Sequence, residues 1–172
     1  FEITDPCGTK VGSSDIWHIE DSKDRFYVYD ADHVEFSPDR QKLVIGTSYG
    51  AILETYSIGN GKITPQFIGK FIQPSVEFAT SDADFSRTIL GFNDIYVSGN
   101  KIYSSYDGEA VGNRNASDVF HDIAIWSITG EAIKMVKTDK TIEKICYDDM
   151  EQVLYAIVSD IEGNHIAAFR GI

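Results

Sequence analysis

Short stretches in which apolar and polar residues alternate follow one another along most of this chain. Alternation with a period of two is typical of β-strands that bury one face, whereas the spacing of an amphipathic helix is almost absent. The pattern therefore predicts an all-β protein of consecutive antiparallel strands. Expected strands cover residues 15–20, 25–29, 42–46, 51–58, 62–67, 101–106, 122–128, 131–136, 152–158 and 165–169.

A larger pattern of successive strands separated by polar turns recurs three times. Its copies begin at residues 34–36, 94–96 and 143–145. Gly and Asn occupy the turns at residues 59–61 and 98–100, where a tight hairpin requires positive φ. Because a repeat of this kind buries its apolar faces against its neighbours, it indicates a radial or stacked array. We predict a partial β-propeller built of about three to four four-stranded antiparallel blades.

The expected domain organisation is a single partial propeller over residues 1–172. Two units are longer than an ordinary blade because they carry polar insertions at residues 72–90 and 107–121. The expected parts are the end of a preceding blade (1–31), a blade (32–90), a second blade (91–140) and an incomplete blade (141–172).

Charge and composition exclude several classes of partner. With 15 basic and 27 acidic residues, the chain has a net charge of −12, which repels nucleic acid, so we expect no nucleic-acid partner. No apolar run reaches the roughly 20 residues that span a bilayer, and we expect no membrane span. Cys7 and Cys146 are too far apart in sequence to indicate a metal-ligand pair or a disulfide framework.

The polar insertion at residues 107–121 is the best candidate for a ligand-binding site, because loops held by a rigid scaffold are where recognition usually lies. Scattered single histidines and Asp-rich hairpin turns match no metal site, and no nucleophile motif or phosphate-binding glycine loop occurs. We therefore expect no catalytic residue, no metal and no cofactor. The candidate ligand-binding residues are Asp107, Arg114, Asn115, Asp118 and His121.

Several strands resemble a known family. Residues 91–97 (GFNDIYV) and 101–103 (KIY), followed by 123–126 (IAIW) and 145–148 (ICYD), resemble the TolB-like six-bladed β-propeller proteins. The resemblance implies a carboxy-terminal half, because six four-stranded blades need about twice this length. It also implies a location outside the cytoplasm, in the periplasm or at the cell surface. Since the first residue is Phe1 and not Met, we expect that a signal, a lipid-anchor segment or a preceding part of the protein has been removed.

Three functions remain open at this point. The leading hypothesis is a non-enzymatic binding or protein-interaction module for an unknown protein or small-molecule ligand. The alternative is a propeller enzyme acting on carbohydrate or another small substrate, which would gather several titratable groups with displaced pKa values in one pocket. The third is a fragment that completes a larger ring, which predicts a large exposed apolar face. In each case we expect an open arc of blades to pair with a second copy or with a missing amino-terminal half.

Overall fold

The computed structural model describes residues 2–13, 28–29, 32–70, 77–79, 82–84, 86–113 and 120–172. Three antiparallel meanders make up most of this part of the chain. The first sheet contains β3 (Asp32–Phe36), β4 (Lys42–Thr47), β5 (Ile52–Gly59) and β6 (Lys62–Lys70). The second contains β9 (Phe92–Ser98), β10 (Lys101–Tyr106), β11 (Asp122–Ser127) and β12 (Ala132–Lys137). The third contains β13 (Thr141–Asp148), β14 (Val153–Asp160) and β15 (Gly163–Arg170).

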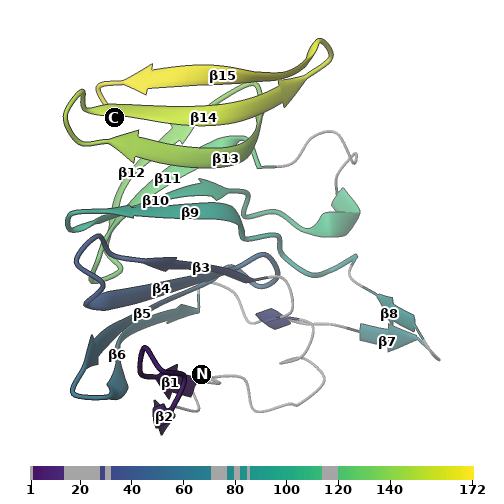
Figure 1. Cartoon of the computed structure of the whole chain (residues 1–172). Coiled ribbons are helices and arrows are strands. Elements are labelled where there is room, and N and C mark those ends of the chain that lie inside the picture. Colours follow the sequence, from purple (N-terminus) through teal and green to yellow (C-terminus); the bar gives the residue numbers. More distant parts are fainter. Residues whose placement is uncertain are drawn as a thin grey trace.

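The first strands of the three sheets lie next to one another. Strand β9 contacts β3 on one side and β13 on the other. From this shared edge the sheets spread apart like a fan, with β6, β12 and β15 at the outer margins (Figure 1). Sheets of one design arranged around a common inner edge are the blades of a propeller. The predicted all-β class and partial propeller are therefore confirmed.

The second sheet is buried on both faces, because successive residues of a strand point to opposite sides. Ile102 and Trp126 belong to a cluster with Val44 and Leu53 of the first sheet. Their neighbours along the strands pack in a second cluster with the third sheet. The members of this second cluster are Tyr103, Ile123, Ile125, Ile142, Ile145, Leu154, Ala156 and Val158. Burial on both faces explains why the core of β11 reads as an unbroken apolar run, Ile-Ala-Ile-Trp.

Hydrogen bonds from side chains to backbone join the second sheet to the third. Asn93 Nδ2 donates to the carbonyl oxygens of Ile142 (3.0 Å) and Glu143 (3.3 Å). Ser105 Oγ donates to the same Ile142 oxygen at 3.0 Å. The backbone N–H of Ile145 donates to Asp94 Oδ2 at 2.8 Å. These bonds satisfy backbone groups that face the neighbouring sheet, and they fix the spacing between the two blades.

Shorter elements lie outside the three meanders. The alternation of apolar and polar residues did not predict the hairpins β1 (Glu2–Thr4) with β2 (Lys10–Ser13) and β7 (Glu77–Ala79) with β8 (Asp82–Asp84), or the short 3₁₀ helix η1 (Val111–Asn113). The strand expected at 15–20 lies outside the described residues. The strand expected at 25–29 is wrong at Val28 and Tyr29, whose backbone is helical. Both side chains are buried in one cluster with Ile52, whereas consecutive side chains of a strand would point in opposite directions.

Candidate functional site

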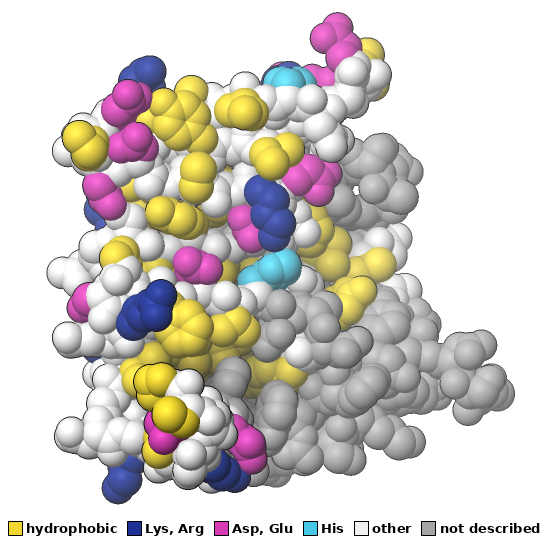
Figure 2. All heavy atoms as spheres, viewed as in Figure 1, with side chains coloured by type: hydrophobic (Ala, Val, Ile, Leu, Met, Phe, Trp, Pro, Cys, Tyr) yellow, Lys and Arg dark blue, Asp and Glu magenta, His cyan; other side chains and the backbone are white. Residues whose placement is uncertain are grey.

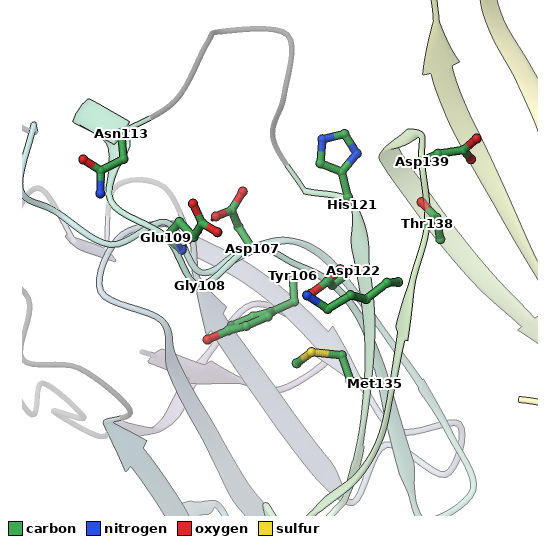
Figure 3. A pocket seen from close by; sticks show the side chains of 11 residues that line it. Tyr106, Asp107, Gly108, Glu109, Asn113, His121, Asp122, Met135, Thr138 and Asp139 are labelled. Carbon is green, nitrogen blue, oxygen red and sulfur yellow. Dashed lines mark hydrogen bonds between the residues drawn. The ribbon is translucent and has the colours of Figure 1, made fainter.

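A hollow of about 760 Å³ opens at one end of the second sheet. It lies where β10 ends, β11 begins and β12 ends (Figure 3). Antiparallel pairing brings these three strand ends together, because Asp122 is paired with Tyr106 on one side and with Lys137 on the other. The side chains around the hollow are those of Tyr106, Asp107, Glu109, Asn113, His121, Asp122, Met135, Lys137, Thr138 and Asp139, with Gly108 between them.

Two of the five predicted ligand-binding residues, Asp107 and His121, line this hollow. They come from the two ends of the polar insertion, which the hairpin geometry places near each other. The other three, Arg114, Asn115 and Asp118, lie outside the described residues. The ligand-binding role of all five stays a prediction.

Asp107 holds the two ends of the insertion together. Its Oδ1 accepts a hydrogen bond from the backbone N–H of Glu109 (2.9 Å), and its Oδ2 accepts one from the N–H of Phe120 (2.9 Å). Phe120 has a φ of 56°, in the left-handed region that non-glycine residues adopt only with support. The buried Asp107 carboxylate supplies that support, so its first role is to position the loop.

The floor of the hollow includes Tyr106, whose ring is held by two other aromatic rings. The Tyr106 centroid lies 5.3 Å from that of Phe92 and 6.3 Å from that of Trp126. Burial, and next the nearby carboxylates of Asp107 and Asp122, raise the pKa of Tyr106, so its phenol stays protonated at neutral pH. The hollow is therefore lined in part by an aromatic side chain that its neighbours hold in place.

Four carboxylates surround the hollow, those of Asp107, Glu109, Asp122 and Asp139. Lys137 and His121 are the basic side chains among the lining residues. An excess of carboxylates around a concave surface attracts cations and repels anions. Asp122 and Asp139 were not predicted as site residues: Asp122 directly follows the insertion at the start of β11, and Asp139 lies in the loop between β12 and β13. The predicted antiparallel meander could have indicated both residues, because alternate connections of a meander lie at the same end of the sheet.

The sequence profile described as TolB-like 6-blade propeller-like matches residues 12–150, which is most of the chain. The chain belongs to this family. The family prediction is thereby confirmed, while a search of curated proteins finds no match. Within the described part of this TolB-like protein, no helix is long and apolar enough to cross a bilayer. No group of three or more His, Cys, Asp and Glu side chains among the described residues could hold a metal ion.

Solved structures similar to this TolB-like chain include Kluyvelomyces marxianus Hsv2, with 10% identity and a TM-score of 0.45, covering 81% of this chain and 33% of that one. A second is the β-propeller domain of Myceliophteria thermophila Cps50 (Swd1), with 14% identity and a TM-score of 0.46, covering 79% and 39%. A third is KlHsv2 with loop 6CD replaced by a Gly-Ser linker, with 11% identity, a TM-score of 0.40 and coverage of 80% and 38%. The chain thus spans between 33% and 39% of the length of these proteins.

The inner edge of the TolB-like fan carries a second group of charged residues. Lys144 Nζ lies 2.7 Å from Asp94 Oδ1, so this pair connects the second and third blades. Burial, and next the Asp94 carboxylate, raise the pKa of Glu35, whereas burial, and next the Lys144 ammonium, lower the pKa of His33. Figure 2 shows basic, acidic and histidine side chains mixed along the middle of this face. Because Asp94 is engaged with Lys144 and with the Ile145 N–H, we assign this group to the joint between blades.

Proposed function

We propose that this protein is a non-enzymatic binding module whose ligand occupies the hollow at the end of the second blade. A propeller-fold protein of this family is suited to protein interaction, because its rigid sheets hold loops and turns at fixed positions. The observation that carries the proposal is the hollow itself, with the ring-packed Tyr106 on its floor and the ends of the predicted insertion at its rim. The carboxylates around it favour a ligand group that is cationic, such as a lysine or arginine side chain of a partner protein.

A pair of peptides tests this proposal, one rich in lysine and arginine and the other with glutamate at the same positions. We expect the basic peptide to bind and the acidic one not to bind, with affinity falling as salt is added because the rim is exposed to solvent. Changing Asp122→Asn and Asp139→Asn together is expected to weaken binding of the basic peptide about tenfold, or about 1.4 kcal/mol. Titration calorimetry measures the affinity.

The matched control removes the same two charges away from the hollow. Glu151→Gln with Glu162→Gln changes two exposed residues of the β13–β14 and β14–β15 turns and is expected to leave the affinity unchanged. Equal binding of the two peptides, or an equal loss in both double variants, would show that overall acidity and not the hollow governs recognition. Failure of both peptides to bind would contradict the choice of a cationic ligand group.

We also propose that the ends of the fan are covered by further blades, from a second copy or from an amino-terminal half. The outer face of the third sheet supports this, because Ile157 and Ile166 there are 42% and 75% exposed. These two side chains are register partners on β14 and β15 and border a hollow of about 230 Å³ that also includes Cys146 and Tyr155. If a second copy covers this face, the protein should self-associate in dilute solution and Ile157→Lys should abolish the association. A folded monomer at every concentration would contradict a second copy as the partner.

For location, we propose that the protein works outside the cytoplasm, in the periplasm or at the cell surface, with a lipid-anchored precursor. Fractionation of cells that make the full-length protein tests this proposal. Recovery of the protein with the cytoplasmic enzymes would contradict it.

A further inference from the structure

Strand β12 exposes two apolar side chains beside the hollow at the end of the second blade. Ile133 is 52% exposed and Met135 is 48% exposed. Both residues border a second, shallow hollow of about 220 Å³ next to β11, which Ala124 and Trp126 also line. Met135 lines the larger hollow as well (Figure 3). The two hollows therefore meet at Met135, and we call Ile133 and Met135 the apolar strip.

The strip belongs to the middle blade of the fan. The second blade lies between the first and the third (Figure 1), so blades added at either end of the fan would cover other faces. Lys134, which separates the two residues in sequence, donates from Nζ to the carbonyl oxygen of Gly171 at 3.0 Å. Its ammonium group is therefore held beside the third blade and leaves the strip apolar. Apolar side chains that gather on a surface beside a hollow are typical of a binding site.

Recognition at this margin is expected to depend on side chains and not on an added strand. Strand β12 carries Lys134 and Lys137, and its pairing with β11 is irregular between Ile125 and Trp126. Lysines and bulges at an edge both oppose pairing with another strand. Methionine favours side-chain contact, because its flexible thioether adapts to apolar partners of different shapes.

We propose that the partner segment bound at the hollow carries an apolar side chain two residues from its lysine or arginine, and that this apolar side chain packs on the strip. This inference rests on the function proposed above and names the class of partner. The partner is an extended protein segment with the pattern apolar, any residue, basic, read in either direction along its chain.

The spacing of groups along the meander supports this pattern. In the ladder of β11 and β12, Ala124 is opposite Met135, and Asp122, two residues away, is opposite Lys137. Two residues along a strand span about 7 Å. An extended segment repeats its side chains on one side at the same interval, so a basic group beside Asp122 places the next side chain on that side at Met135.

The hollow and the strip select different parts of such a segment. The carboxylates of Asp122 and Asp139 attract the basic group, as the proposed function requires. The strip adds affinity by removing apolar surface of both partners from water. A segment that has the basic group alone gains only the first of these contributions.

Two basic peptides that differ at one residue test the pattern. One has leucine two residues from its lysine, and the other has serine at that position. We expect the leucine peptide to bind at least fivefold more tightly, measured by titration calorimetry. Equal and measurable affinities would overturn this inference and leave the proposed function intact. If neither peptide binds, the proposed function and this inference both fail.

The double variant Ile133→Thr with Met135→Gln tests where the apolar contact lies. Threonine keeps the branched Cβ and glutamine keeps the length of the side chain, so we expect the fold to be retained, which circular dichroism checks. We expect the preference for leucine to be lost and the affinity for the serine peptide to be unchanged. Met150→Gln with Ile161→Thr is the matched control, because these residues are 95% and 104% exposed on turns of the third blade. A preference that survives the first double variant, or that is lost equally in the control, would overturn the inference.

The two methionines of the chain provide a second measurement at the site itself. With ¹³C-labelled methionine methyl groups, NMR follows Met135 and Met150 separately, and Met150→Gln assigns the two signals. We expect the leucine peptide to shift the Met135 signal more than the serine peptide does and to leave the Met150 signal in place. A shift of Met150 alone, or of neither signal when the leucine peptide is bound, would overturn the inference.

Discussion

Gly91→Ala is expected to lower the free energy of unfolding by about 3 kcal/mol or more. Gly91 lies where the chain passes from the first blade to the second. A Cβ atom there would come within 2.5 Å of both Ala51 Cα and the Thr47 carbonyl oxygen, and within 2.8 Å of Ala51 N. These are backbone atoms and cannot move aside as a flexible side chain can.

Relaxation of the backbone would break the hydrogen bonds on either side of Gly91. Its N–H donates to the Ser48 carbonyl at 2.7 Å, and its own carbonyl accepts from the N–H of Asp107 at 3.0 Å. Chemical denaturation measures the change in stability. Gly59→Ala is the matched control, because no atom lies within 4 Å of the added Cβ, and we expect it to stay within about 0.5 kcal/mol of the parent. Equal stability of the two variants would show that the blade junction is less tightly packed than the structure indicates.

Glu54→Ala is expected to lower the free energy of unfolding by about 3 kcal/mol, because two buried phenols lose their shared acceptor at about 1–3 kcal/mol each. The Glu54 side chain is fully buried on β5. Its Oε1 accepts a hydrogen bond from Tyr29 Oη and its Oε2 accepts one from Tyr56 Oη, each at 2.6 Å. Through Tyr29, this carboxyl group connects the amino-terminal segment to the first blade.

A surface pair of the same chemistry provides the control for Glu54. Tyr155 Oη donates to Glu151 at 2.9 Å in an exposed position, so Glu151→Ala is expected to change stability by less than about 0.5 kcal/mol. Equal losses in the two variants would contradict a special role for the buried pair of tyrosines. Denaturation with matched buffers and probes measures both variants.

The same buried group gives stability a dependence on alkaline pH. Burial, and next the hydrogen bond to Glu54, raise the pKa of Tyr56 above its ordinary value. The folded state therefore binds this proton more tightly than the unfolded state, so its contribution is complete below about pH 10 and decreases as the pH rises beyond that value. Tyr56→Phe is expected to reduce the alkaline loss of stability, measured as unfolding midpoints between neutral and alkaline pH.

The sequence pattern predicts the meanders well because the alternation that indicates each strand lies within that strand. Alternation over residues 101–106 and 152–158 and the glycine turns between strands depend on neighbours in sequence. The helical backbone of Val28 and Tyr29 was not predictable in this way, since contacts with Ile52 and Glu54 override the β propensity of the two residues.

The candidate site was predictable in part. The composition of the insertion indicated Asp107 and His121, which lie at its ends. Asp122 directly follows the insertion and Asp139 lies in the next loop at the same end of the meander, but periodicity does not indicate which of these side chains turn toward one hollow. The clamp that Asp107 makes on Glu109 and Phe120 is also absent from the pattern, because it depends on backbone groups 2 and 13 residues away.

The hydrogen bonds between the second and third blades constrain which residues of the two blades can change. Asn93, Asp94 and Ser105 contribute side chains to these bonds, whereas the third blade contributes backbone atoms of Ile142, Glu143 and Ile145. Every amino acid except proline offers the same backbone groups. We therefore expect changes at exposed positions of β13 other than Lys144, which pairs with Asp94, to leave these bonds in place. Loss of Asn93, Asp94 or Ser105 instead removes bonds whose partners in the third blade are backbone atoms, so a side-chain change in that blade would not restore them.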